Sequence, residues 1–127
     1  MSTPAAPRER LLALFAKCRA ATRDFAASRA NHERPAQDLL ALIGFWMDYN
    51  IERLGYFARG EQAPRGVDFD ALTQASITIN AHRTWNGSLA YAEAAFDRFS
   101  ATIAASPDAV LLANNTYDDD PGGPAWG

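Results

Sequence analysis

Hydrophobic side chains recur every three or four residues over 8–29, and charged side chains fall mostly off this stripe. That spacing places the apolar side chains on one face of an α-helix. The sequence therefore predicts an amphipathic helix over 8–29 with a single buried face. The stripe consists of Leu11, Phe15, Cys18, Thr22 and Phe25.

A second helix is predicted over 35–59. Pro35 suits a first helical turn, where its missing N–H costs nothing, and Gly60 is the expected C-terminal stop. Apolar residues cover more than one face of this stretch, so we expect it to contact two neighbours. Gly44 and Gly55 lower helix propensity inside it, and we interpret both as points of close helix packing.

A third helix is predicted to start near Asn86 or Ser88 and to end near Ala105. Its apolar stripe is formed by Trp85, Leu89, Ala92, Phe96, Phe99 and Ile103. The Ser106-Pro107-Asp108 sequence then breaks the helix, and Ser106 is expected to cap a short turn.

The stretch 69–83 is ambiguous. Phe69, Leu72, Ser76 and Ile79 fit one helical face, whereas the β-branched run 77–79 favours a strand. We prefer a helix, because no partner strand is evident elsewhere in the chain.

The predicted fold class is all-α, an up-down helical bundle of three clear helices plus the ambiguous 69–83 segment. Residues 1–7 form a loose lead-in, 8–112 the bundle, and 113–127 an irregular acidic tail rich in glycine and proline that cannot be a helix as written. The length of 127 residues suits one domain.

Composition narrows the function classes. A net charge of −3 argues against a nucleic-acid-binding domain, which would show a basic excess. The single cysteine, Cys18, excludes an internal disulfide framework, and no apolar run is long enough to cross a membrane. Without a secretory signal, the sequence predicts a cytoplasmic protein.

No metal or cofactor site is predicted. A zinc site would need Cys18, His32 and His82 to converge from three separate segments. The aspartates 118–120 lack the spacing, glycine and distal glutamate of a calcium loop, so a solvated acidic tail is favoured. Nucleophile-and-base and phosphate-loop signatures are also absent.

The second predicted helix carries polar groups beside aromatic ones: Trp46, Tyr49, Asn50 and Arg53. We interpret them as lining a small-molecule pocket in the bundle core. The alternative is that Trp46 is core and Arg53 reaches solvent along the helix flank. His82 is the candidate catalytic residue for proton transfer near neutral pH, and whether the protein is an enzyme stays open.

The stretch 38–46 (DLLALIGFW) resembles the second-helix signature of the DinB/YfiT-like four-helix bundles, closest to the ClbS/DfsB branch. The similarity continues through 59–61 (RGE), 69–72 (FDAL), 96–103 and 106–108. This resemblance implies a DinB-like bundle that binds or detoxifies small molecules.

Two departures from the family pattern stand out. Leu42 occupies the position of the family's second-helix metal ligand, which implies a degenerate metal site, and no fourth helix is evident before residue 127. An interaction module or fragment completed by homodimerisation is therefore an alternative. A metal-dependent transferase with ligands beyond residue 127 is the second alternative.

Overall fold

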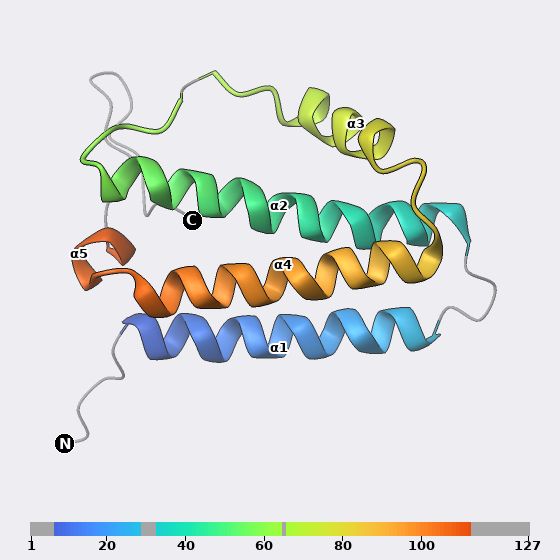
Figure 1. Ribbon diagram of the computed structural model, residues 1–127, viewed down its shortest axis with the longest axis horizontal. Helices are drawn as coiled ribbons and strands as arrows, with labels where there is room; N and C mark the ends of the chain where they lie inside the picture. Colours follow the sequence, from blue (N-terminus) through green and yellow to red (C-terminus); the bar gives the residue numbers. More distant parts are fainter. Residues whose placement is uncertain (1–6, 29–32, 65, 113–127) are drawn as a thin grey trace.

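The computed structural model describes residues 7–28, 33–64 and 66–112, which form five helices and no strand (Figure 1). The prediction of an all-α protein is confirmed for this part of the chain. The lead-in before Pro7, His32 and the predicted tail lie outside the described residues. The helices are α1 (Pro7–Ser28), α2 (Arg34–Ala58), α3 (Phe69–Ile79), α4 (Trp85–Ala105) and α5 (Asp108–Leu111).

The first four helices alternate in direction along the chain, so that α2 and α4 run parallel to each other and antiparallel to α1 (Figure 1). Helix α4 packs against both α1 and α2, and α3 packs against α2. In Figure 1, α3 lies on the side of α2 away from α4. Helix α2 therefore has two covered faces, as the breadth of its apolar pattern predicted.

The core is centred on α4. Most of the predicted stripe of this helix is buried, with Ala92, Phe96, Phe99 and Ile103 each at most 1% exposed, and Leu89 is half-buried. One cluster joins the stripe to Leu54 of α2 and to residues of α1 and α5, and a second gathers where α1 ends and α2 begins. Burial of the aromatic rings dominates the stability of such a core.

An ionic cluster joins α1 to α4 beside this core. Arg19 and Arg23 both donate to the carboxylate of Glu93 at 2.7 Å, and Arg19 also pairs with Asp97. The hydrogen bonds from Arg23 and Arg19 hold the pKa of Glu93 below its ordinary value of 4.5, against the opposing effect of burial. The carboxylate is therefore favoured in its charged form.

At Gly44, a side chain of α4 packs directly against the backbone of α2. A Cβ atom at this position would lie 2.4 Å from Cε1 of Tyr91, which no packed structure tolerates without movement. The prediction of close packing is confirmed at Gly44. It is wrong at Gly55, where a Cβ atom would meet only the flexible end of Arg59 at 3.3 Å.

Helix α4 ends at Ala105 as predicted, but its start and the cap after it differ from the sequence prediction. The helix begins at Trp85, because Oγ1 of Thr84 accepts a hydrogen bond from the amide of Gly87 and caps the first turn. The expectation that Ser106 caps the following short turn is wrong. Its hydroxyl donates back to the carbonyl of Thr102 at 2.6 Å, and Pro107 precedes α5 without a side-chain cap.

Candidate functional site

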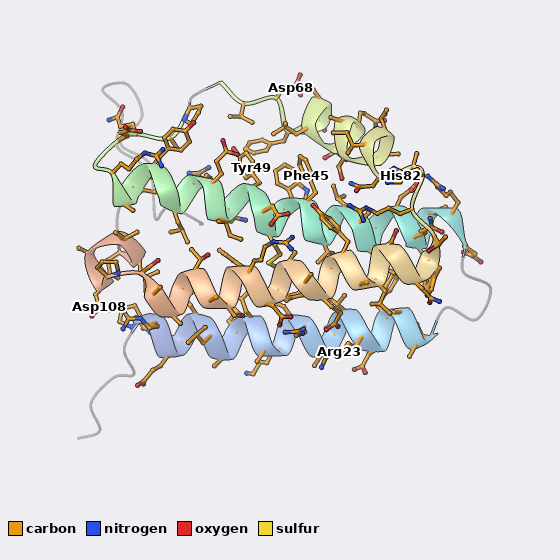
Figure 2. The ribbon with its side chains drawn as sticks, in the orientation of Figure 1. Arg23, Phe45, Tyr49, Asp68, His82 and Asp108 are labelled. Carbon is orange, nitrogen blue, oxygen red and sulfur yellow. The ribbon has the colours of Figure 1, made fainter. Side chains whose placement is uncertain are left out.

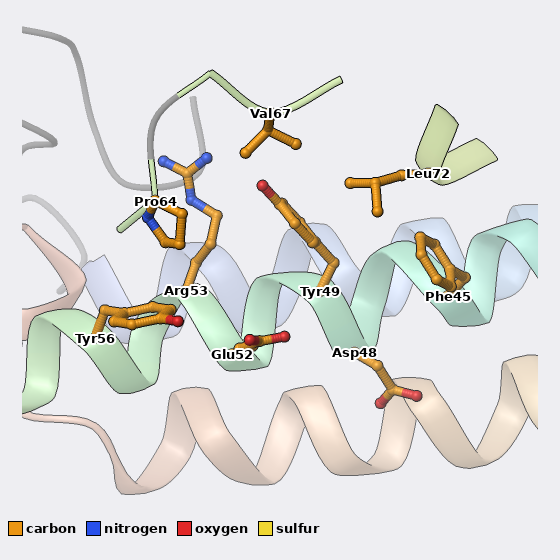
Figure 3. Close-up of a pocket in the computed structure, with 9 residues that line it drawn as sticks. All are labelled: Phe45, Asp48, Tyr49, Glu52, Arg53, Tyr56, Pro64, Val67 and Leu72. Carbon is orange, nitrogen blue, oxygen red and sulfur yellow. The ribbon is translucent and has the colours of Figure 1, made fainter. Parts of the chain in front are cut away.

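A cavity of about 380 Å³ lies between the outer face of α2 and the segment that leads into α3 (Figure 3). Aromatic and aliphatic side chains form most of its wall, and three charged side chains complete it. The lining residues are Phe45, Asp48, Tyr49, Glu52, Arg53, Tyr56, Pro64, Val67 and Leu72.

Helix periodicity places the floor of the cavity on one side of α2. Phe45, Tyr49 and Arg53 follow one another at steps of four residues and therefore lie one above the other along the helix. Glu52 and Tyr56 form the neighbouring row, again four residues apart. The floor is thus set by local sequence alone.

The roof depends on a tight reversal of the chain after α2. Gly60 adopts a φ of 72° just beyond the helix, and the amides of Gly60 and Glu61 bond back to the carbonyls of Phe57 and Tyr56. This is the Schellman arrangement, in which glycine carries the left-handed residue at low cost. The prediction that Gly60 stops the helix is confirmed, and the reversal places Pro64 and Val67 over α2 (Figure 3).

The start of α3 closes the cavity at its far end. Oδ1 of Asp68 accepts from the amide of Ala71 at 3.0 Å and caps the helix. The ring of Phe69 contacts the rings of Trp46 and Tyr49 of α2, with centroids 5.8 and 6.4 Å away. Phe69 nevertheless remains 53% exposed. These contacts position Leu72 in the cavity wall.

A polar network holds the other end of α3. Asn80 is buried and donates to the carbonyl of Ser76 at 2.9 Å, while Nε of Arg83 donates to Oδ1 of Asn80 at 2.7 Å. The carbonyl of Arg83 in turn accepts from Gln37 of α2. The ambiguous 69–83 stretch is therefore a helix that ends at Ile79 and a hydrogen-bonded turn that follows it.

Arg53 differs from the neighbouring charged residue Asp48 in its hydrogen bonding. Its Nε is buried and has no hydrogen-bond partner among the described residues. Asp48, by contrast, accepts hydrogen bonds from Arg98 of α4 at 2.9 and 3.0 Å and from the hydroxyl of Tyr91 at 3.1 Å. Figure 3 shows the carboxylate of Glu52 directed away from the Arg53 guanidinium. The cavity thus contains an unsatisfied cationic donor.

The structure brings together only part of the predicted site. Tyr49 and Arg53 line the cavity, whereas Trp46 and Asn50 are not among its lining residues. Trp46 packs against Phe45, Tyr49 and Phe69, and the side-chain amide of Asn50 donates to the carbonyl of Trp46 at 2.9 Å. The cavity also lies outside the bundle core, on the opposite side of α2 from α4.

His82 lies apart from this group. It is exposed in the turn between α3 and α4 and is not among the residues that line the cavity (Figure 2). The structure places no other predicted site residue beside it. Its catalytic role stays a prediction from the sequence.

Sequence reasoning overlooked Phe45 and Tyr56 on the floor and all of the roof. The step of four that joins Phe45 to Tyr49 and Arg53 was a usable signal for the floor. For the roof, Gly60 and Gly66 indicate a reversal of the chain, but they do not indicate which face of α2 the chain then covers.

Two kinds of feature are absent from the described residues 7–28, 33–64 and 66–112. No group of three or more His, Cys, Asp or Glu side chains in these ranges is placed to hold a metal ion. None of the described helices is long and apolar enough to span a membrane. Neither His32 nor the aspartates 118–120 belong to these ranges.

The chain matches no protein-family model, no curated protein and no solved structure.

Proposed function

We propose that this protein binds a small organic molecule in the cavity between α2 and α3. The observation that carries the proposal is the cavity itself, which is walled mainly by aromatic and aliphatic side chains and includes a few polar groups. Its volume of about 380 Å³ lies within the range of roughly 300–1,000 Å³ that is usual for small-molecule sites. Tyr49 and Arg53, expected from the sequence to bind substrate, both belong to it.

The proposal extends to a DinB-like bundle of the ClbS/DfsB sort that acts on reactive small molecules. Its support is the resemblance together with the helical fold, in which the 38–46 signature lies within α2. Leu42, at the expected ligand position, is half-buried beside Leu39 and Ile77, an apolar setting that suits a degenerate metal site. On this proposal, a reactive molecule that binds in the cavity is also chemically altered there.

Binding can be tested with a neutral apolar fluorophore such as 1-aminoanthracene. Its emission should rise on addition of the wild-type protein. The Leu72→Trp variant, which fills the cavity, should abolish the rise and leave the circular dichroism spectrum unchanged. The matched control is Leu14→Trp, because Leu14 is 53% exposed on α1, away from the cavity. Equal binding by the wild type and Leu72→Trp would contradict the proposal.

A second candidate function is assembly with another copy of the chain. The supporting observation is an apolar surface at the α2 N-terminus, where Leu39 is 42% exposed and borders two shallow hollows. Exposed apolar surface of this kind is typical of interaction sites. Its remaining apolar members are Phe25, Pro35, Leu42 and Ile77.

Light scattering coupled to size-exclusion chromatography tests the homodimer. The wild type should elute with twice the mass of one chain, and Leu39→Glu should shift it to a single chain. Leu14→Glu introduces the same charge elsewhere and should leave the mass unchanged. A wild type with the mass of one chain at high micromolar concentration would rule out this candidate.

A further inference from the structure

We infer that the ligand of the α2–α3 cavity is an organic acid with an apolar body and a single carboxylate, and that Arg53 binds the carboxylate. This inference rests on the proposed function, because it assigns a chemical class to the molecule that occupies the same cavity. Three observations support it. The buried Nε of Arg53 has no acceptor among the described residues, the neighbouring charged groups are paired or directed elsewhere, and apolar side chains line the cavity beyond Arg53.

The side chain of Arg53 is half-buried, and one of its donors lacks an acceptor. Its Nε is buried, and no described residue accepts a hydrogen bond from it. Leaving a buried donor unpaired is costly, and the cost is greater when the group is charged. A carboxylate relieves this cost because its two oxygens match the planar fork of a guanidinium, with two parallel N–H···O bonds and opposite charge.

The other charges around the cavity are already compensated or directed elsewhere. Asp48 has Arg98 and the hydroxyl of Tyr91 as partners across the α2–α4 interface. Arg59, at the end of α2, pairs with Glu61 at 3.2 Å and lies over the ring of Tyr56. Glu52, the third charged residue of the lining, is exposed, and its carboxylate is directed away from the Arg53 guanidinium (Figure 3). Within the described lining, Arg53 is thus the charged side chain that lies beside the apolar wall without a counter-ion.

The apolar part of the cavity extends from Arg53 along α2. Figure 3 shows the Arg53 guanidinium beside Pro64 at one end and Phe45 with Leu72 at the other, with Tyr49 and Val67 between them. The Tyr49 hydroxyl points toward Val67, on the same side of α2 as the guanidinium. A ligand that fits this order has its carboxylate at one end and an aromatic or aliphatic body of modest size at the other.

Ligands of other charge fit the same wall less well. An amine would bring a positive charge against Arg53, and like charges in a partly desolvated site repel. A neutral molecule fills the apolar part equally well but offers at most a weaker acceptor to the guanidinium. The charge of the ligand, rather than its shape, should therefore determine the order of affinities.

Three naphthalene derivatives of nearly equal size separate charge from shape: 2-naphthoate, 2-naphthamide and 2-naphthylmethylamine. At pH 7 they are anionic, neutral and cationic. Isothermal titration of the full chain should give the tightest binding for 2-naphthoate, about tenfold tighter than for the amide, the margin expected of one charge-assisted hydrogen bond. The amine should bind most weakly.

Variants locate the effect at Arg53. Arg53→Met should weaken 2-naphthoate binding about tenfold and leave 2-naphthamide unchanged, while Arg53→Lys should retain part of the preference. Arg10→Met is the control for net charge, because Arg10 is exposed on α1, away from the cavity, and should not alter any of the affinities.

The outcomes distinguish the two proposals. Equal binding of the three compounds, unaffected by Arg53→Met but abolished by Leu72→Trp, would overturn the organic-acid inference and leave the cavity function standing. Tighter binding of the amine than of the carboxylate would overturn the inference as well. If none of the three binds, or if Leu72→Trp binds them as the wild type does, both proposals fail.

Discussion

The two covered faces of α2 have the same apolar sequence character but different packing. Toward α4, Leu40, Ala41 and Gly44 are buried, and the polar contact at Asp48 is matched by two donors from α4. Toward α3, Phe45, Tyr49 and Arg53 are half-buried, and a cavity remains between the helices. The face packed on α4 supplies stability, whereas the face covered by α3 leaves volume and an unsatisfied donor for a ligand.

This contrast has a physical basis in the length and anchoring of the covering helix. Helix α4 has 21 residues, and its Tyr91 ring packs directly against Gly44 of α2. Helix α3 has only 11 residues and is held at its two ends, by Phe69 at the start and by Asn80 just beyond the end. A helix fixed mainly at its ends need not fill the space beneath the loop that precedes it.

The largest expected difference between the two faces is in their Phe-to-Ala variants. Phe99→Ala, in the core on α4, should lower the free energy of unfolding by about 3–5 kcal/mol, because Phe99 is 1% exposed and leaves a cavity behind. Phe45→Ala, on the face toward α3, should cost less than half as much. Urea denaturation followed by circular dichroism measures both. Equal losses would remove the distinction between the faces.

A glycine pair tests how tightly each part of α2 is packed. Gly44→Ala should lower the free energy of unfolding by about 1–3 kcal/mol, because its methyl group collides with the ring of Tyr91. Gly55→Ala meets only a flexible arginine tip and should raise stability by up to about 1 kcal/mol through better helix propensity. Thermal melts of the two variants report both signs, and a neutral Gly44→Ala would show that α2 and α4 can separate at low cost.

The smallest expected effect concerns the ionic cluster on α4. The pKa of Glu93 is lowered in the folded protein, so its contribution to stability is present above pH 4.5 and is lost as the pH falls through the lower, folded pKa. Glu93→Gln should cost about 1 kcal/mol or less at pH 7, and the difference from wild type should shrink below about pH 4.5. Denaturation at pH 7, 5 and 3 measures it.

Asp24→Asn provides the matched control for that series, since Asp24 is an exposed carboxylate on α1, the helix that carries Arg19 and Arg23. Its stability should follow the wild type at every pH. If Glu93→Gln loses stability by the same amount at pH 7 and pH 3, then the carboxylate charge is not the source of the contribution.

The three long helices were predictable because their signals are local. The stripe through Phe96, Phe99 and Ile103 fits only a helical period, and Gly60 carries its own stop signal. The 69–83 stretch was not decided by local sequence, because the β-branched residues 77–79 compete with its helical spacing. The cap at Asp68 and the network around Asn80 settle it as a helix.

The candidate site was predictable only in part, for a similar reason. The spacing of Trp46, Asn50 and Arg53 predicts one shared helical face, and Tyr49, four residues before Arg53, lies on the same side of α2 as Arg53. Trp46 and Asn50 could not be separated from them, because only the observed contacts show Phe69 against Trp46 and the Asn50 amide bonded to its own helix. His82 is distant from the site along the chain and does not line the cavity, and its role remains a hypothesis.

The sequence by itself determined the three long helices and which of their sides are apolar, since both follow from the chemistry of residues within a few positions of one another. Only the tertiary structure decided that α4 covers one side of α2 closely and that α3 covers the other side incompletely. That outcome depends on the path of the chain after Gly60 and on contacts between residues far apart in sequence, such as Phe69 with Trp46. The cavity and the unpaired Nε of Arg53 follow from that incomplete cover.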